Sequence, residues 1–252
     1  MTSLHALIQT LDDWMKPELL KDYAPNGLQV EGRDTISRLA LGVTASADVI
    51  QQAVAWGADA LLVHHGYFWR NEPPVLTGMK GQRVRALMNH QMSLIAYHLP
   101  LDCHAEFGNN KALLDQLGLV GGQPIAEENG LLWSVPLPNA MTIDQLALQV
   151  QSALGRAPMV IESARGSETL SRLVVCTGGA QDYLTKALSY GADVYLSGEI
   201  SERTTHEARE LGVHYIAAGH HATERYGIQA LGQKLASTLG VDVAFFDDHN
   251  PA

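Results

Sequence analysis

The sequence lacks the features that define several large classes of protein. It has only two cysteines, Cys103 and Cys176, which lie far apart in unrelated contexts. Such a pair is neither a disulfide framework nor a thiolate zinc cluster, so we expect reduced thiols. The apolar runs are no longer than a β-strand, so no segment is predicted to span a membrane. Residues 1–15 lack a basic region and a cleavage site and read as an amphipathic helix, which favours a cytoplasmic protein.

Positive charge is also scarce. The chain has 17 lysines and arginines against 27 acidic residues, a formal net charge of −10. A general nucleic-acid binder needs basic surface to displace counterions from phosphates, so nucleic acid is not an expected partner. Any anionic ligand must meet local positive charge, and the eleven histidines supply it if they bind a metal. Because the sequence has no GxSxG motif and no local cysteine-nucleophile signature, it does not indicate nucleophilic side-chain catalysis.

An internal repeat gives the first positive signal. Residues 38–65 align without a gap on residues 172–199 with eight identities, including Gly-Ala-Asp at 57–59 and 191–193. Each segment reads as a strand, a turn of small residues, an amphipathic helix with a glycine C-cap at Gly57 or Gly191, and a second strand. This pattern predicts a βαβ unit with neighbouring parallel strands in each half.

The repeat predicts an α/β fold made of two related halves. We expect mixed sheets flanked by helices, with a metal site in the cleft between the halves. The predicted division is a first half at 1–120 with an N-terminal helix, a crossover segment at 121–166, and a second half at 167–252, all in one intimately packed unit. The crossover contains a strand-like LLWSVPLP at 131–138 and a helix at about 142–154.

Histidines and carboxylates gather where the predicted strands end. The first βαβ unit ends in His64 and His65, followed by Gly66, which we expect to relax the backbone past the last ladder bond. The next strand runs into HLPLD, where Pro100 is expected to stop the strand and leave Asp102 in a loop. Because ligands collect at the carboxyl ends of parallel strands, this edge is a candidate site.

The corresponding strand of the second half runs into GHHATE. A helix that starts near Ala222 would bring Glu224 back toward His220 at a four-residue spacing. Histidine nitrogen with carboxylate oxygen suits zinc, iron, manganese or nickel, and carboxylates bridge paired cations. Five side chains are too many for one open catalytic ion, so the pattern favours two divalent transition-metal ions per chain. The predicted metal ligands are His64, His65, Asp102, His220 and Glu224.

Other motifs have a structural interpretation beside the functional one. His98 and His221 are candidates to orient a metal ligand, whereas the remaining histidines are expected at the surface or in packing. CTGGA at 176–180 resembles a phosphate-cradling turn, but a tight turn that needs glycine is the better interpretation. The aromatic residues of GYFW at 66–69 could stack on a planar ring or equally belong to the core or an interface.

Several motifs together resemble the YbgI family, whose members are labelled GTP cyclohydrolase I type 2 homologues. The resemblance covers essentially the whole chain, without the extra central domain of larger members. It implies a dinuclear metal centre at the same five ligands and a toroidal homohexamer. The motifs are DYAPNGLQVEG (22–32), GVTAS (42–46), VHHGYFW (63–69), HLPLD (98–102), CTGG (176–179), SGE (197–199) and GHHATER (219–225).

Two classes of function follow from this resemblance. The first is a metal-dependent hydrolase that acts on a nucleotide-like small molecule such as GTP, with Arg70 and Arg225 placed to neutralise phosphate. A metallo-phosphoesterase would use the same centre. The second is a non-catalytic role, as a metal-binding oligomeric adaptor or regulatory protein. Fold alone does not choose between them.

The asymmetry between the repeats indicates a catalytic residue. Where the first half has His64 and His65, the second has Gly198 and Glu199. If Gly198 opens space over the ions, Glu199 is a candidate general base or proton relay, and His98 is a second candidate for moving protons. The structural alternative is that Glu199 caps the following segment or pairs with an arginine.

We expect a homo-oligomer, with the hexamer implied by the family resemblance. The aromatic residues beside the histidine pair offer apolar contact area for subunit association. Light scattering at micromolar protein concentration should therefore give a mass well above 27.3 kDa. A monomeric mass would contradict this prediction.

Overall fold

The chain divides into two compact units in the computed structural model, which describes residues 1–252 apart from the side chains of residues 138–140. One unit comprises residues 1–101 and 228–249, and the other comprises residues 102–227 and 250–252. The predicted division of the sequence after residues 120 and 166 stays a prediction. Among the described residues, no helix is both long enough and apolar enough to cross a membrane.

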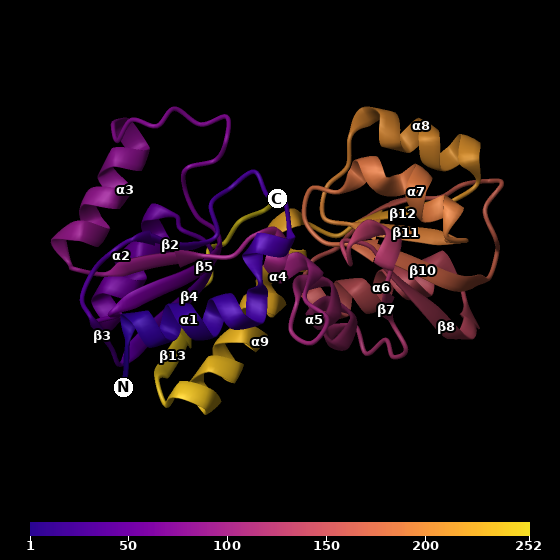
Figure 1. Cartoon of the computed structure of the whole chain (residues 1–252). Coiled ribbons are helices and arrows are strands. Elements are labelled where there is room, and N and C mark those ends of the chain that lie inside the picture. The colour runs from indigo at the N-terminus through magenta and orange to yellow at the C-terminus, as the bar shows by residue number, and fades with distance from the viewer. The chain divides into compact units, whose positions relative to one another are not determined.

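The first unit contains a five-stranded mixed sheet in the order β13-β4-β5-β6-β2 (Figure 1). Strands β13, β4, β5 and β6 run parallel, and β2 pairs antiparallel with β6. The elements are β1 (Thr2–Ser3), α1 (Leu4–Met15), β2 (Gly27–Val30), β3 (Thr35–Ile36), β4 (Arg38–Thr44), α2 (Ala47–Trp56), β5 (Ala60–His65), α3 (Gly78–Asn89), β6 (Ser93–Ala96) and β13 (Asp242–Phe245), with a 3₁₀ turn at Pro17–Leu19.

The parallel strands of this sheet are apolar on both faces, as strands covered by helices on each side must be. Leu61 and Val63 of β5 pack on one face with Val49 of α2 and Leu87 of α3. Alternate residues point to the other face, where the side chain of Leu41 lies against Gly232 in the second part of helix α9 (His220–Leu239).

The second unit contains a six-stranded mixed sheet in the order β7-β8-β10-β11-β12-β9. Strands β10, β11 and β12 run parallel, with antiparallel neighbours β8 and β9 on either side. The elements are α5 (Asn109–Gln116), β7 (Gln123–Pro124), β8 (Trp133–Met141), α6 (Ile143–Leu154), β9 (Met159–Ile161), β10 (Leu170–Cys176), α7 (Leu184–Ser189), β11 (Val194–Ser197), α8 (Glu202–Leu211), β12 (His214–Ala217) and the start of α9, with 3₁₀ turns at Ala126–Glu128 and Gln181–Tyr183. The short helix α4 (Leu99–Cys103) precedes them.

Strand alternation sorts the core of the second unit into two faces. Leu173 and Val175 of β10 pack with Leu146 of α6, whereas Val174 and Cys176 belong to the core under α7 and α8. Figure 1 shows α7 and α8 on one side of this sheet and α6 on the other. The predicted fold class, mixed α/β with helices flanking mixed sheets, is thus confirmed.

The two sheets share a strand order, β4-β5-β6-β2 and β10-β11-β12-β9, with the last strand antiparallel in both. The Gly-Ala-Asp identity has a structural cause. The Asp59 carboxylate accepts hydrogen bonds from the backbone N–H groups of Ser37 and Arg38, and Asp193 accepts the equivalent bonds from Ser171 and Arg172. This pattern supports a repeat of structure, and the duplication itself stays a prediction.

Local predictions were right in one helix and partly wrong in another. Helix α6 begins after Thr142, which forms a capping box with Gln145, and ends at the C-cap Gly155. The helix expected to end at Gly191 instead splits into a 3₁₀ turn and the six-residue α7, whose C-cap is Tyr190. Pro138, the last residue of the predicted strand, lies outside the described side chains.

The buried Asp59 gives a test of the fold. Replacing Asp59 by alanine leaves the Ser37 and Arg38 N–H groups without their acceptor, so the free energy of unfolding should fall by about 1–3 kcal/mol. Chemical denaturation measures this loss. The control is Asp115→Ala, which removes an exposed carboxylate paired with Lys111 and should change stability by less than about 0.5 kcal/mol. Equal stability of the two variants would contradict the assigned role.

Candidate metal centre

Three histidines cluster at the carboxyl ends of neighbouring strands in the first unit. His64 and His65 end β5, and His98 follows β6. One ring nitrogen of each lies within 4.8 Å of the other two. The ring centroids are 4.4 Å apart for His64 and His65, and 5.0 Å apart for His64 and His98.

Backbone and carboxylate acceptors orient two of these rings. His64 Nδ1 lies 3.1 Å from the carbonyl oxygen of Tyr97, and His98 Nδ1 lies 2.9 Å from Asp22 Oδ1. Because both oxygens only accept, Nδ1 of each ring carries the proton. In the neutral imidazole Nε2 then holds a lone pair, as a metal ligand requires. His65 Nδ1 lies 3.1 Å from the Thr44 hydroxyl.

The predicted backbone conformation at His64, His65 and Gly66 was wrong in two details. His65 still pairs with Thr44 in the β4–β5 ladder, so the pair does not lie past the last ladder bond. Gly66 does not relax the backbone by a left-handed conformation. A Cβ at this position would lie 2.2 Å from Gln29 Oε1 and 2.7 Å from the Ala96 side chain, so the glycine is required by close packing.

Asp22 holds the loop beside the histidines, a role that the sequence did not reveal. Its carboxylate accepts hydrogen bonds from the backbone N–H of Leu99, the side chain of Asn26 and His98. Burial would raise the pKa of Asp22, but the bond and the charge of His98 outweigh it and hold the pKa well below its usual range. Because Leu99 is the first residue of helix α4, its N–H bond to Asp22 anchors the Asp22–His98 pair to the start of that helix.

Two carboxylates and one histidine lie close together in the second unit. Glu224 and Asp102 are only 3% and 8% exposed, and oxygens of the two lie within 4.8 Å of each other. His220 Nε2 lies 3.3 Å from Glu224 Oε1. Helix α9 begins at His220 rather than near Ala222, and the predicted four-residue spacing brings the two side chains together.

Acidic neighbours dominate the electrostatics of this group. Burial lowers the pKa of His220, but hydrogen bonds and charges of Glu224 and Glu199 outweigh it and raise the pKa to about 9. Burial raises the pKa of the Cys176 thiol, and the charges of Asp102 and Glu224 raise it further. The side chains of Asp102, Glu224 and His220 offer oxygen and nitrogen donors to a metal.

The CTGG turn packs directly on these side chains. Gly178 has φ of +69°, and a Cβ there would lie 2.1 Å from Glu224 Oε1 and 3.2 Å from His220 Nε2. The N–H of Gly178 donates to the Thr223 hydroxyl, and its carbonyl oxygen accepts from the N–H of Gly198. These contacts support the interpretation of CTGG as a tight turn that needs glycine.

Asp102 lies in helix α4 instead of a loop, because Pro100 is tolerated in the first turn of a helix. Asn109 donates to Asp102 Oδ1 at 2.7 Å, and Asn110 donates to the Asp102 carbonyl oxygen. Asn110 also accepts from the N–H of Thr177 in the CTGG turn. The two asparagines thus join Asp102 to the CTGG turn. In the sequence, only the adjacent polar residues Asn109 and Asn110 could have indicated this connection.

Glu199 lies beside His220, with Oε1 2.6 Å from His220 Nδ1. Among the hydrogen bonds and ion pairs that the structure describes, the Glu199 carboxylate has no arginine partner. Gly198 does not open space, because a Cβ there would lie 2.6 Å from the backbone of His220. The glycine instead lets the two backbones approach closely.

The remaining candidates have local partners. Trp69 lies edge-on to His98 with ring centroids 4.9 Å apart, whereas Tyr67 is buried in the core. Arg70 donates to the carbonyl oxygen of Asp22, and the Arg225 guanidinium lies over the Tyr226 ring. The phosphate-binding role of both arginines stays a prediction.

The donor sets of both groups fit divalent transition metals. Imidazole nitrogen and carboxylate oxygen suit zinc, iron, manganese and nickel. Two carboxylates buried this close together repel each other, and a cation compensates that repulsion. Ion number and identity, and the division of ligands between ions, stay predictions.

The chain is similar to one family over nearly its whole length. Residues 2–251 match the profile described as Duf34/NIF3 (NGG1p interacting factor 3). A protein of Allochromatium vinosum named GTP cyclohydrolase 1 type 2 homolog is 51% identical over 252 residues, which cover 100% of this chain and 98% of that protein. The Vibrio cholerae protein of the same name is 48% identical over 242 residues, 96% of each chain.

Solved structures agree with the sequence comparison. Protein ybgI, described as of unknown function, is 42% identical and superposes with a TM-score of 0.95 over 100% of both chains. A Thermus thermophilus protein is 30% identical and superposes with a TM-score of 0.90, also over 100% of both chains.

Metal analysis tests the ligand prediction. Purified protein should carry about two transition-metal ions per chain, as five ligands require. The double variant His64→Ala/Asp102→Ala should lose most of this metal, because it removes two of the five predicted ligands. Elemental analysis measures the content, and circular dichroism checks the fold.

The matched control is His206→Ala/Asp115→Ala, which removes an exposed histidine and an exposed aspartate. It should keep the parent's metal content. Retention of two ions by the His64/Asp102 variant would refute the ligand assignment.

Proposed function

Because this chain belongs to the Duf34/NIF3 family, we propose that it is a dinuclear metal-binding protein that acts as a metal-dependent hydrolase on a nucleotide-like substrate. The observation that carries the proposal is the buried carboxylate pair Asp102 and Glu224, whose charges a divalent cation compensates. The proposed ligands are His64, His65, Asp102, His220 and Glu224.

Several side chains support these ligands by fixing their orientation. The Tyr97 carbonyl oxygen holds His64 with Nε2 as the ligand atom, and Asn109 holds one oxygen of Asp102. When bound, two divalent ions would supply Lewis-acid activation of water near neutral pH. A closely packed CTGG turn restrains Glu224, because Gly178 leaves no room for the carboxylate to shift toward it.

Two pairs of residues support a role in proton transfer. Glu199 Oε1 lies 2.6 Å from His220 Nδ1, close enough for a proton to pass between them, and the Glu199 side chain is 44% exposed, so it would also reach solvent or substrate. His98 holds a proton on Nδ1 against Asp22. We assign Glu199 as the main proton relay and His98 as the second.

The nucleotide-like substrate is inferred from the relatives. The curated relatives are named GTP cyclohydrolase 1 type 2 homolog. That name refers to hydrolytic opening of the guanine imidazole ring in GTP. A hydrolase with a metal centre of nitrogen and oxygen donors is consistent with such a reaction and also with cleavage of a phosphoester.

The Glu199→Gln variant tests the proposal. Glutamine keeps the size of the side chain and removes its basicity, so the metal content should stay at the parent's level while turnover of GTP falls by about 10²–10⁴-fold. Loss of guanine absorbance follows the reaction. The control is Glu202→Gln, which alters another glutamate–histidine pair, with His206, on an exposed face of α8 and should leave turnover unchanged.

Each alternative result has a distinct meaning. Unchanged turnover removes Glu199 from the mechanism. A parallel loss of metal and turnover assigns Glu199 only to orienting His220, since such partners are worth about 10–100-fold in metal affinity. No turnover of GTP or simple phosphoesters by the metal-replete parent contradicts the hydrolase and favours a non-catalytic metal-binding role.

A further inference from the structure

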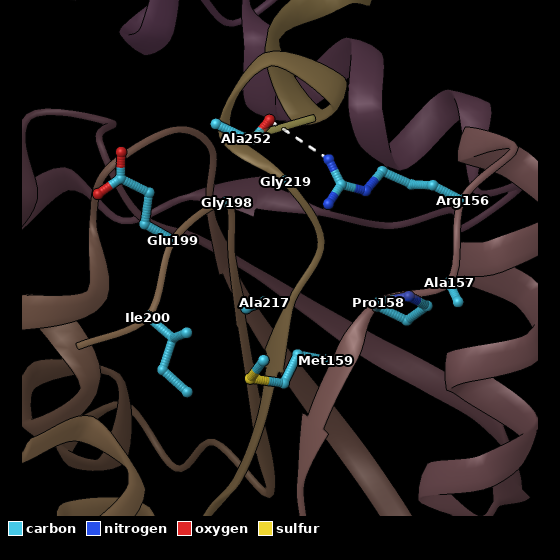
Figure 2. Close-up of a pocket in the computed structure, with 10 residues that line it drawn as sticks. All are labelled: Arg156, Ala157, Pro158, Met159, Gly198, Glu199, Ile200, Ala217, Gly219 and Ala252. Carbon is cyan, nitrogen blue, oxygen red and sulfur yellow. Dashed lines mark hydrogen bonds between the residues drawn. The ribbon is translucent and has the colours of Figure 1, made fainter. Parts of the chain in front are cut away.

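A cavity of about 580 Å³ lies in the second unit beside the group that contains His220. Figure 2 shows the Glu199 side chain on one side of this cavity and the Arg156 side chain on the other. Met159, Ile200 and Ala217 supply an apolar base between them. The cavity thus combines a cation, a carboxylate and an apolar surface.

Arg156 is held in a defined position at the rim. Its Nη1 donates to the main-chain oxygen of Ala252 at 3.3 Å, and the backbone N–H of His221 donates to the same oxygen at 3.2 Å. Gly219 has φ of +102°, and a Cβ there would lie 2.4 Å from Arg156 Nη1. The glycine of GHHATER therefore makes room for the guanidinium beside the first turn of α9.

This arrangement is suited to an oxyanion. A guanidinium has five N–H donors in a planar fork, so one bond to a carbonyl oxygen uses only part of its capacity. The bound oxygen of Ala252 shows that the fork and the His221 N–H converge on one acceptor. In a chain with a net charge of −10, such local positive charge is what an anionic ligand needs.

The opposite side of the cavity sets a second requirement. Glu199 repels a second anionic group and accepts hydrogen bonds, so a ligand must present an N–H or O–H donor there. Met159 is 56% exposed and, with Ile200 and Ala217, offers an apolar surface for the middle of the ligand.

We propose that this cavity binds a small molecule with an oxyanion, phosphate or carboxylate, at Arg156 and the His221 N–H, a donor group at Glu199, and an apolar or planar body over Met159 and Ile200. The bound oxyanion would replace the main-chain oxygen of Ala252 as the acceptor for Arg156 and the His221 N–H. Calling this molecule the substrate rests on the proposed function. Its binding to the cavity does not, because binding needs neither a metal nor turnover.

Direct binding to the full chain tests the proposal. Calorimetry with inorganic phosphate, acetate and guanosine monophosphate compares the two oxyanions and the larger ligand, with metal-loaded protein and after chelation. We expect guanosine monophosphate to bind more tightly than inorganic phosphate or acetate. We also expect this binding to remain after the metal is removed by chelation. Arg156→Gln should weaken it tenfold or more, because a charge-assisted hydrogen bond is lost. A preference for acetate over phosphate would assign the site to carboxylates.

Two further variants make the result decisive. Arg165→Gln is the matched control, because Arg165 Nη1 also donates to a backbone carbonyl oxygen, that of Glu210 at 3.2 Å, on the exposed surface of the same unit. It should bind like the parent. Arg156→Lys keeps the charge without the fork and should bind between the parent and Arg156→Gln, which keeps the test valid if the glutamine variant does not fold.

Binding that is lost on chelation but unaffected by Arg156→Gln would overturn the proposal, because the anion would then sit on the metal. No binding of any of the three ligands at millimolar concentration would overturn it as well. Neither result bears on the hydrolase, since turnover is measured separately. Conversely, anion binding at Arg156 without turnover would leave this site standing while contradicting the proposed activity.

Discussion

Buried like charge is the constraint on which the candidate centre depends. Asp102 and Glu224 lie within 4.8 Å of each other with almost no exposure to water. Burial and mutual repulsion both oppose ionisation of the pair, so the chain must supply compensation by protons, donors or a cation. Asn109 donates to Asp102 and His220 contacts Glu224, and the carboxylate oxygens of this pair are donor atoms that suit a divalent cation.

The surrounding scaffold is built of residues that permit close approach. Gly178, Gly198 and Gly66 each occupy positions where a Cβ would lie less than 3 Å from another atom. At Gly178 and Gly198 the glycine backbone packs against the candidate ligands Glu224 and His220, and at Gly66 it packs against Gln29 and Ala96. Rigid packing of this kind keeps ligands oriented before a metal binds, which reduces the entropic cost of binding.

The sequence predicted the parts of the fold that depend on local periodicity. Parallel strands, the capped helix after Thr142 and the His220–Glu224 spacing follow from patterns within a few residues. It did not predict the pairing of β13 with β4, because that contact joins residues about two hundred positions apart in the chain. Nor did it reveal Asp22 or Asn109, because a polar residue in a loop has no periodicity that indicates its partner.

Gly66 and Gly198, expected to relax the backbone and to open space over the ions, proved to be packing residues instead. A glycine before a functional residue gives the same sequence signal whether it opens space or allows contact, and only the neighbouring backbone decides. At Gly198 the neighbour is the backbone of His220, and at Gly219 it is the Arg156 guanidinium. The Gly219 N–H also donates to the Gly198 carbonyl oxygen, so the two glycines bring the end of β11, the start of α9 and Arg156 close together. A ligand held at that arginine would lie in the same cavity as Glu199, whose Oε1 is 2.6 Å from His220 Nδ1, so that ligand binding and metal chemistry would share one hydrogen-bonded connection.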